Sequence, residues 1–354
     1  MTGTSSYTQP FAAIGLADRP TVGGKGASLG ELQRAGVRVP PGFVVTTAAF
    51  EEHLEAADAD GSIRRTIRQL DPDDLSAMTT ATAQVRLRIE SAAMPVAVLS
   101  AVAAALRELG ETEPVAVRSS ATSEDAEDAS FAGLQDTYLW VRGTDAVIDH
   151  VRRCWASLYS VESVTYRLRR NIPEEGVAMG VVVQRMVDSG TSGVMFTRSP
   201  ETGDRSVIAI ESCWGLGSCL VGGEVTPDRF VVNKVTGDII RRTISQKTCC
   251  HVPDPDGSGV RQGQVTTEHQ STPSLIDAEI KALASLGKRL EAHYGRAQDI
   301  EWAIDKSSTG PDDIYLLQSR PETVWSTRDA APIAAPKANA MEHLLVALGG
   351  PGRR

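Results

Sequence analysis

Two carboxylates near the end of the sequence have the types and spacing of a metal site. Residues 299–305 read Asp-Ile-Glu-Trp-Ala-Ile-Asp, so acidic or small residues alternate with large apolar ones. Alternate side chains of a β-strand share a face, which places Asp299 and Glu301 together and the apolar residues opposite them. Carboxylates in register make a poor sheet surface but suit a hard cation such as Mg²⁺. The segment therefore predicts a strand with one metal-binding face.

A second strand would place an amide and a cation beside these carboxylates. Residues 315–321 read Tyr-Leu-Leu-Gln-Ser-Arg-Pro, with Gln318 and Arg320 near the end. If the two strands form a hairpin, these side chains stand next to Asp299 and Glu301. A solvent-facing edge hairpin with a salt bridge explains the same residues equally well, and this segment alone does not separate the two hypotheses.

A glycine-rich segment near the start of the sequence has the composition of an anion site. Residues 23–32 read Gly-Gly-Lys-Gly-Ala-Ser-Leu-Gly-Glu-Leu and lead into an amphipathic helix. Glycines at a helix start present backbone N–H groups to an anion, and Lys25 would add a mobile positive charge. The spacing is neither that of a Walker A loop nor G-x-G-x-x-G after a strand. A glycine-rich helix start that binds nothing is the alternative.

A loop between two predicted strands has the composition of a lid. Residues 114–121 predict a strand that carries Arg118 and two serines near its end, and an acidic loop follows over 122–130. A turn containing Gly133 then leads into a second strand. A flexible loop with a glycine where the backbone must come close suits a cover over a phosphate chain. The acidic residues favour the alternative, an ordinary surface loop, unless they point away from the phosphates.

The elements around these segments predict a mixed α and β protein. Helical patterns cover residues 61–110, 144–170 and 275–294. Short apolar segments bounded by turns predict strands within 39–46, 207–213, 230–232 and 238–244. We also predict a long strand over 178–187, which contains Gln184, with residues 190–197 as its hairpin partner. The polar residues 251–273 predict an exposed loop.

The overall composition excludes several classes of partner. At 354 residues the chain is long for one core, so two or three domains are expected. Its net charge of −9 argues against nucleic acid or an anionic membrane as the main partner. There is no apolar run long enough to span a membrane, and residues 1–9 lack an apolar signal core, so we expect a cytoplasmic location. The five cysteines lack paired spacing and fit reduced thiols.

Eight segments taken together resemble one protein family. In chain order they are GGKGASLGEL (23–32), VPPGFVVT (39–46), VAVRSSATSED (115–125), FAGLQDTYL (131–139), SGVMFTRSP (192–200), WGLGS (214–218), DIEWAID (299–305) and LLQSRPETVW (316–325). They resemble the N-terminal nucleotide-binding domain shared by phosphoenolpyruvate synthase, pyruvate phosphate dikinase and rifampin phosphotransferase. One such match arises easily by chance, whereas eight in family order do not.

The resemblance implies an α+β fold of the ATP-grasp type, in which a small α+β lobe and a β-rich lobe clamp ATP between them. We expect the N-terminal lobe, with the Lys25 loop, over residues 1–110 and the central strand, loop and helix part of the clamp over 111–190. The β-rich lobe with the metal-binding strand would cover 191–325. Residues 326–354 would be a linker and tail.

The resemblance also implies ATP and Mg²⁺ as cofactors and a phosphotransferase chemistry. A phosphoryl or pyrophosphoryl group would pass to a histidine of a separate swivelling domain, and then to a small-molecule acceptor that the sequence does not identify. Such a transfer asks the protein mainly for cations and positioned donors around the phosphates. The implied site residues are the catalytic cations Lys25, Arg118 and Arg320, the lid residues Gly133 and Thr137, Gln184 near adenine, Gln318 at the phosphates, and Asp299 and Glu301 for Mg²⁺.

The sequence departs from the family pattern at two points. The family often has a glutamate after Gly-Leu-Gly, where this chain has Ser218, and Glu211 or Glu224 would have to replace it. None of the six histidines lies in the Gly-Gly-Thr-x-His setting of the family's phosphorylated residue. We therefore expect the acceptor histidine on another polypeptide, as in phenylphosphate synthase, or a chain that is part of a longer enzyme.

Other hypotheses remain open at this point. The chain would be the ATP-binding domain of rifampin phosphotransferase or phosphoenolpyruvate synthase if it is a fragment. A non-catalytic nucleotide sensor is a further alternative, which Ser218 slightly favours and the intact cations disfavour. An ATP-grasp ligase that forms an acyl phosphate would need no histidine partner.

Overall fold

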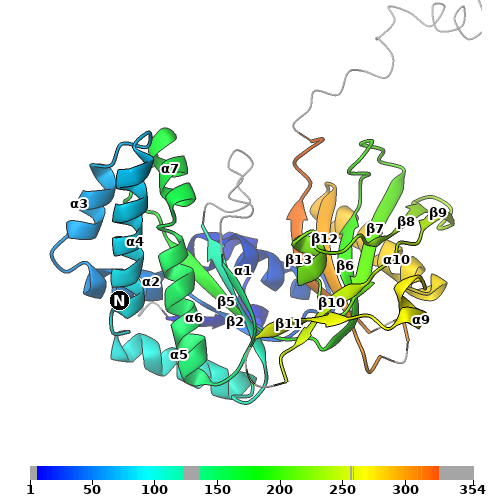
Figure 1. Cartoon of the computed structure of the whole chain (residues 1–354), viewed down its shortest axis with the longest axis horizontal. Coiled ribbons are helices and arrows are strands. Elements are labelled where there is room, and N and C mark those ends of the chain that lie inside the picture. The colour runs from blue at the N-terminus through cyan, green and yellow to red at the C-terminus, as the bar shows by residue number, and fades with distance from the viewer. Residues whose placement is uncertain are drawn as a thin grey trace, which may run out of the picture. The chain divides into compact units, whose positions relative to one another are not determined.

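Two large antiparallel sheets and the helices packed on them make up the fold (Figure 1). The computed structural model describes residues 6–122, 136–255, 257, 259–308, 310, 311 and 313–326. By its internal contacts the chain divides into two units, Met1–Glu322 and Thr323–Arg354, and all the elements named below belong to the first. The predicted α+β class is confirmed.

The first sheet has five strands in the order β1-β2-β5-β3-β4. Its strands are β1 (Thr8–Pro10), β2 (Gly42–Val45), β3 (Val115–Ala121), β4 (Thr137–Val141) and β5 (Met179–Arg185). Alternation along β3 divides the side chains between two environments. Val115 and Val117 lie in the core beneath a group of helices, whereas Ala116 and Arg118 line a cavity on the other face. The pattern of the sequence therefore sets which side of the sheet carries chemistry.

Six helices cover the apolar face of this sheet. They are α2 (Thr47–Ala57), α3 (Ser62–Arg68), α4 (Leu75–Ser91), α5 (Val96–Leu109), α6 (Thr144–Ser157) and α7 (Val161–Arg169). Their buried side chains form one core with β2, β3 and β5, centred on Trp155, which has no exposed surface. Among the described residues no single helix is long and apolar enough to cross a membrane, although α4 and α5, bent by 71°, meet the length and composition criteria together.

The second sheet has six strands in the order β13-β12-β6-β7-β8-β9. Its strands are β6 (Ser189–Phe196), β7 (Val207–Trp214), β8 (Asp228–Asn233), β9 (Ile239–Thr243), β12 (Gln298–Asp305) and β13 (Ile314–Pro321). Helix α10 (Asp277–Tyr294) packs along one face of this sheet (Figure 1). Strands β12 and β13 form the predicted hairpin, but β12 pairs with β6 on its other side. The hairpin therefore lies at the edge of the sheet through β13, as both hypotheses allow, whereas the strand that carries the carboxylates is an inner strand.

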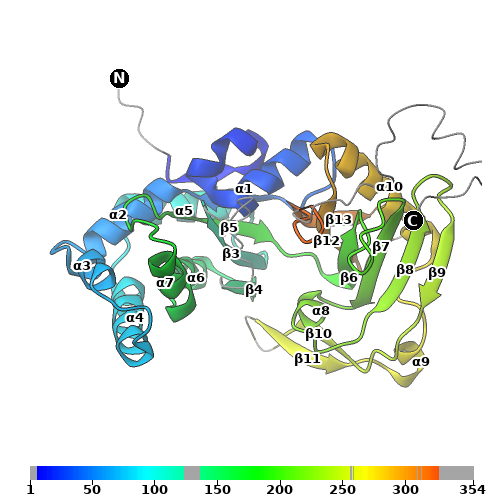
Figure 2. The ribbon, with the colours of Figure 1, turned by 90° about the horizontal axis from the view of Figure 1, so that it is seen from above.

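Helix α1 (Arg19–Arg34) lies between the two sheets (Figure 2). It follows two short 3-10 helices, η1 (Phe11–Ala13) and η2 (Leu16–Asp18). The apolar side chains of α1, including Leu29 and Leu32, share a core with Val182 of the first sheet and Trp302 of the second. The start of the chain is thus part of the packing that holds the two sheets in place.

The predicted hairpin of residues 178–187 with 190–197 is wrong. Strand β5 pairs with β2 and β3, whereas β6 pairs with β7 and β12, so the two segments belong to different sheets. Residues 186–188 cross between the sheets. The Met186 N–H donates to Pro114 O, next to a strand of the first sheet, and Asp188 O accepts from Lys306 N–H, next to a strand of the second sheet. Short separation in sequence suggested a hairpin, but each strand has better partners far along the chain.

The exposed loop expected over residues 251–273 is also wrong in part. Strands β10 (Cys249–Pro253) and β11 (Val260–Gln264) form a two-stranded ribbon, and α9 (Thr267–Gln270) follows. The ribbon has an isolated bridge to Gly215 and Leu216 through His251. The sequence of the ribbon does not alternate between apolar and polar residues, because both faces of a two-stranded ribbon remain largely in contact with water.

Candidate functional site

A cavity of about 570 Å³ brings together the residues that the sequence singled out. Its wall includes residues from both large sheets, from α1 and from the segment that joins β5 to β6. The site residues predicted from the sequence that line it are Lys25, Arg118, Thr137, Gln184, Asp299, Glu301, Gln318 and Arg320. Gly133 lies outside the described residues. The cavity has the size of a typical small-ligand site.

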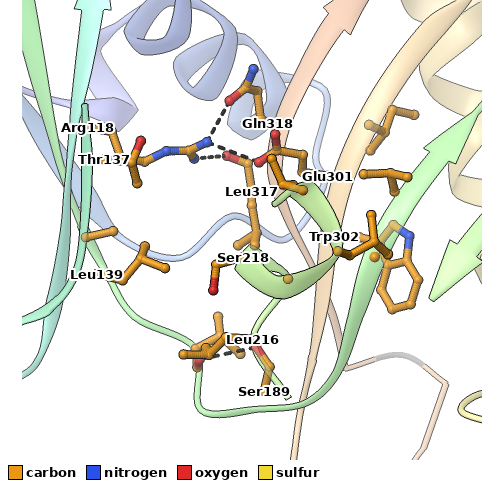
Figure 3. A pocket seen from close by; sticks show the side chains of 18 of the residues that line it. Arg118, Thr137, Leu139, Ser189, Leu216, Ser218, Glu301, Trp302, Leu317 and Gln318 are labelled. Carbon is orange, nitrogen blue, oxygen red and sulfur yellow. Dashed lines mark hydrogen bonds and ion pairs between the residues drawn. The ribbon is translucent and has the colours of Figure 1, made fainter. Parts of the chain in front are cut away.

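Arg118 is the centre of the polar end of this cavity (Figure 3). Its Nη2 donates to Gln318 Oε1 at 2.7 Å and to Glu301 Oε2 at 3.1 Å, and its Nη1 donates to Leu317 O at 3.0 Å. The β12–β13 register shifts between Glu301 and Trp302, so Leu317 has no opposite residue on β12. Such a β-bulge frees the backbone of the extra residue, and here the freed carbonyl holds the guanidinium. The bulge was not evident from the sequence.

Lys25 reaches the same region from α1 because that helix is broken at Gly23. Gly23 has φ +74° and ψ 177°, a conformation that interrupts the helix. The break lets the chain lie against the end of β3, where Ser120 Oγ donates to Val22 O and accepts from Gly26 N–H. The Lys25 ammonium then donates to Ser119 O at 3.0 Å. The glycine-rich segment thus begins the second part of α1 after the break at Gly23, as expected of a helix start, and it also contacts the end of β3.

Gly23→Ala is expected to destabilise the protein strongly. A Cβ at this position would lie 1.9 Å from Ser120 O, and the positive φ adds backbone strain. The strain alone costs about 1–3 kcal/mol, and the clash requires α1 to move away from β3. We expect a lower melting temperature in a thermal scan, with Gly36→Ala as the control. Gly36 has a similar φ of +69° but open space at its Cβ, so equal losses in both variants would contradict the steric argument.

The two carboxylates of β12 differ in environment. Glu301 accepts from Arg118, whereas Asp299 Oδ2 lies 3.5 Å from Arg320 Nε. Burial raises the pKa of Asp299 to about 6, with Arg320 opposing the shift and Glu322 adding to it. The ion pair with Arg320 is too long to offset the burial. Asp299 is therefore a carboxylate whose charge is disfavoured in the absence of a further cation.

Asp299→Asn is expected to remove a pH-dependent loss of stability. In the unfolded chain the carboxyl has its ordinary pKa of 3.8, and in the folded protein it keeps its proton up to about pH 6. The folded state binds this proton more tightly, so the stability contributed by Asp299 falls as pH rises between these values. The difference amounts to at most about 3 kcal/mol. The free energy of unfolding in urea, measured without nucleotide, should rise in Asp299→Asn relative to the wild type between pH 3.5 and pH 7.5. The same difference between the two proteins at both pH values would contradict this prediction.

The donor set at this end of the cavity fits Mg²⁺. Asp299 and Glu301 supply hard carboxylate oxygens from one face of β12, and Gln318 stands opposite Glu301 on β13. Among the described residues no group of three or more acidic, histidine or cysteine side chains forms a complete metal cage. That is the expected arrangement for Mg²⁺, which takes one or two carboxylates from the protein and its other oxygens from phosphates and water.

The other end of the cavity is mainly apolar. Leu139 of β4, Val187 of the connecting segment and Leu216 line it. Gln184 is buried there and its Nε2 donates to Pro40 O at 3.2 Å, which fixes the orientation of the amide. Figure 3 shows Ser218 between this apolar end and the Arg118 cluster. A flat apolar group with one polar edge suits this end of the site.

Ser218 begins the short helix α8 (Ser218–Val221) and is linked to two residues outside the cavity wall. Its Oγ lies 2.7 Å from His251 Nδ1, and His251 Nε2 lies 3.0 Å from Glu224 Oε2. From the sequence, Glu224 is expected only as a substitute for a carboxylate at position 218, and His251 has no expected role. No sequence pattern predicts these two hydrogen bonds, because they depend on the bridge between β10 and the Gly215–Leu216 turn.

Comparison with known proteins adds an independent finding. Residues 19–341 match the family model described as pyruvate phosphate dikinase, AMP/ATP-binding domain. The chain is 44% identical over 343 residues to a probable phosphoenolpyruvate synthase of Staphylothermus marinus, covering 90% of this chain and 41% of the relative. It is also 44% identical over 317 residues to a rifampicin phosphotransferase of a Streptomyces species, covering 89% of this chain and 35% of the relative. The chain thus spans about two fifths of the length of these relatives.

Proposed function

Because the chain belongs to the family of pyruvate phosphate dikinase AMP/ATP-binding domains, we propose that it binds Mg-ATP in the cavity and transfers a phosphoryl or pyrophosphoryl group to a histidine of a separate domain. The histidine would pass the group to a small-molecule acceptor. The observation that carries this proposal is the convergence of Lys25, Arg118 and Arg320 with two carboxylates in one cavity. Phosphoryl transfer needs such positioned charge more than it needs a nucleophile from the protein.

The residues have separate tasks in this proposal. Arg118 and Lys25 would neutralise phosphate oxygens, with Arg118 held in place by Leu317 O and Gln318. Asp299 and Glu301 would hold Mg²⁺, which would offset the negative charge of the phosphates. The apolar end would take the adenine, with Gln184 at its edge.

The described histidines support an acceptor elsewhere. His53, His150, His251, His269 and His293 are the histidines that the structure describes, and none of them lines the cavity. His53 is fully buried and bonded to Ile89 O, and His293 contacts Glu31. None of these five side chains is positioned to receive a group from a ligand in the cavity.

Two measurements test the proposal in order. Mg-ATP at a hundred times its dissociation constant should stabilise the folded protein by about 2.7 kcal/mol, which raises the melting temperature by several degrees. Absence of any shift would overturn the proposal at its first step. With a histidine-bearing domain added, labelled AMP or phosphate should exchange into ATP. Binding without exchange would favour a nucleotide sensor over an enzyme.

A further inference from the structure

The Ser218–His251–Glu224 chain lies beside the middle of the cavity and has no task in the phosphate chemistry. Ser218 lines the cavity, His251 lies on β10 behind it, and Glu224 follows α8. The His251 side chain is 15% exposed and that of Glu224 is 42% exposed, so water reaches the chain from the Glu224 side. The two short hydrogen bonds of His251 use both of its ring nitrogens.

The position of Glu224 fixes which way these hydrogen bonds run. A neutral imidazole carries a proton on only one ring nitrogen, and a carboxylate accepts hydrogen bonds but donates none. Glu224 at Nε2 therefore holds the imidazole proton there, and leaves Nδ1 as an acceptor. The Ser218 hydroxyl must then donate to Nδ1. Its remaining lone pairs make Ser218 Oγ an acceptor toward the cavity.

We propose that Ser218 Oγ, oriented by His251 and Glu224, accepts a hydrogen bond from a sugar hydroxyl of the bound nucleotide. The proposal rests on the proposed function, since it takes the ligand to be ATP. The proposed function places the phosphates at Arg118 and Lys25. With the base against Leu139 and Leu216, the sugar between them lies at the level of Ser218. Figure 3 shows Ser218 in this intermediate position. The site would thus select ribonucleotides over deoxyribonucleotides.

In this arrangement Ser218 contacts the ligand, whereas His251 and Glu224 are positioning residues. Their effect is on the direction of the Ser218 O–H bond. With Glu224→Lys, the ammonium can donate to Nε2 but cannot accept from it, which moves the imidazole proton to Nδ1. Ser218 would then accept from His251 and present its own proton to the cavity. Ser218 Oγ would then keep one lone pair toward the cavity in place of two, so it becomes a poorer acceptor for a sugar hydroxyl without removal of any atom that lines the cavity.

Isothermal titration of the full chain with Mg-ATP, Mg-2′-deoxyATP and Mg-3′-deoxyATP tests the proposal. A neutral hydrogen bond is worth about fivefold to tenfold in affinity, so one of the deoxy analogues should bind the wild type that much more weakly than ATP. Ser218→Ala should bind ATP and that analogue equally. Glu224→Lys should lower the discrimination as well, which a merely structural role of Glu224 would not do.

The chain offers a matched control for these variants. Thr266 Oγ1 lies 2.8 Å from His269 Nδ1, which is the same hydroxyl–imidazole pairing on an exposed segment that does not line the cavity. Thr266→Ala should keep the wild-type discrimination. If the wild type binds ATP but binds both deoxy analogues equally well, or if Ser218→Ala discriminates as the wild type does, the inference fails and the proposed function stands. If the wild type does not bind ATP, both fail.

Discussion

Arg118→Ala is expected to weaken the binding of Mg-ATP by about a hundredfold or more. Hydrogen bonds to charged groups contribute about 1.5–3 kcal/mol each, and a guanidinium at the polar end of the cavity can make two to phosphate oxygens. The side chain is only 10% exposed, so water replaces it poorly. Isothermal titration or the thermal shift produced by Mg-ATP measures the loss. Unchanged affinity for Mg-ATP would show that Arg118 does not contribute to the binding site.

Two further variants show whether charge or geometry is responsible. Arg118→Lys keeps the charge but cannot bridge Leu317 O and Gln318 as the planar guanidinium does. We expect it to recover only part of the affinity. Arg38→Ala is the matched control, because Arg38 pairs with Asp313 and does not line the cavity. A comparable loss in the control would point to a general effect of removing an arginine from the fold.

Glu301→Gln is expected to abolish most of the dependence of ATP binding on Mg²⁺. The amide keeps the size of the side chain and a hydrogen-bond acceptor for Arg118, so the fold should be retained. It removes the negative charge that a divalent cation needs. In the wild type, Mg²⁺ should raise ATP affinity, and in the variant ATP should bind nearly equally with Mg²⁺ and with EDTA. We expect the gain from Mg²⁺ to fall by about a hundredfold, since a charged interaction of about 3 kcal/mol is lost.

Asp305→Asn provides the control on the same strand. Asp305 shares the alternation of Asp299 and Glu301 in the sequence but lies at the end of β12, where its Oδ1 accepts from Ser307 N–H. It does not line the cavity. This variant should keep the full Mg²⁺ effect. A retained Mg²⁺ effect in Glu301→Gln would show that β12 is a structural hairpin strand and that the metal binds elsewhere.

Much of the fold could be predicted because its cause is local. The alternation at 299–305 and the apolar segment that follows predicted the β12–β13 hairpin, and helical periodicity predicted the helices from α3 to α7 and α10. Strand pairing was not predictable in the same way. The sequence between β5 and β6 contains no sign that residues 186–188 cross between two sheets. The pairing depends on distant segments, because β5 pairs with β2 and β6 pairs with β12, each more than a hundred residues away.

The candidate site shows the same difference between features with a local cause and features that depend on tertiary structure. Lys25, Arg118 and the two carboxylates were found from their motifs, and the structure places them around one cavity. The interactions that orient them depend on tertiary structure. The bulge that frees Leu317 O, the break at Gly23 that brings Lys25 to Ser119, and the link from Ser218 through His251 to Glu224 each join segments that no sequence pattern pairs.

The position of α1 between the two sheets also bears on how the protein is made. Ser28 of α1 donates to Ser319 O of β13, a contact between residues 291 positions apart. At a synthesis rate of 5–20 residues per second, roughly 15 to 60 s pass after α1 leaves the ribosome before its last partner strand is made. During that interval the apolar side chains of α1 lack part of their core. Transiently exposed apolar surface favours aggregation, so we expect the nascent chain to be more prone to aggregation before β13 is made than a protein whose first helix packs against its nearest neighbours.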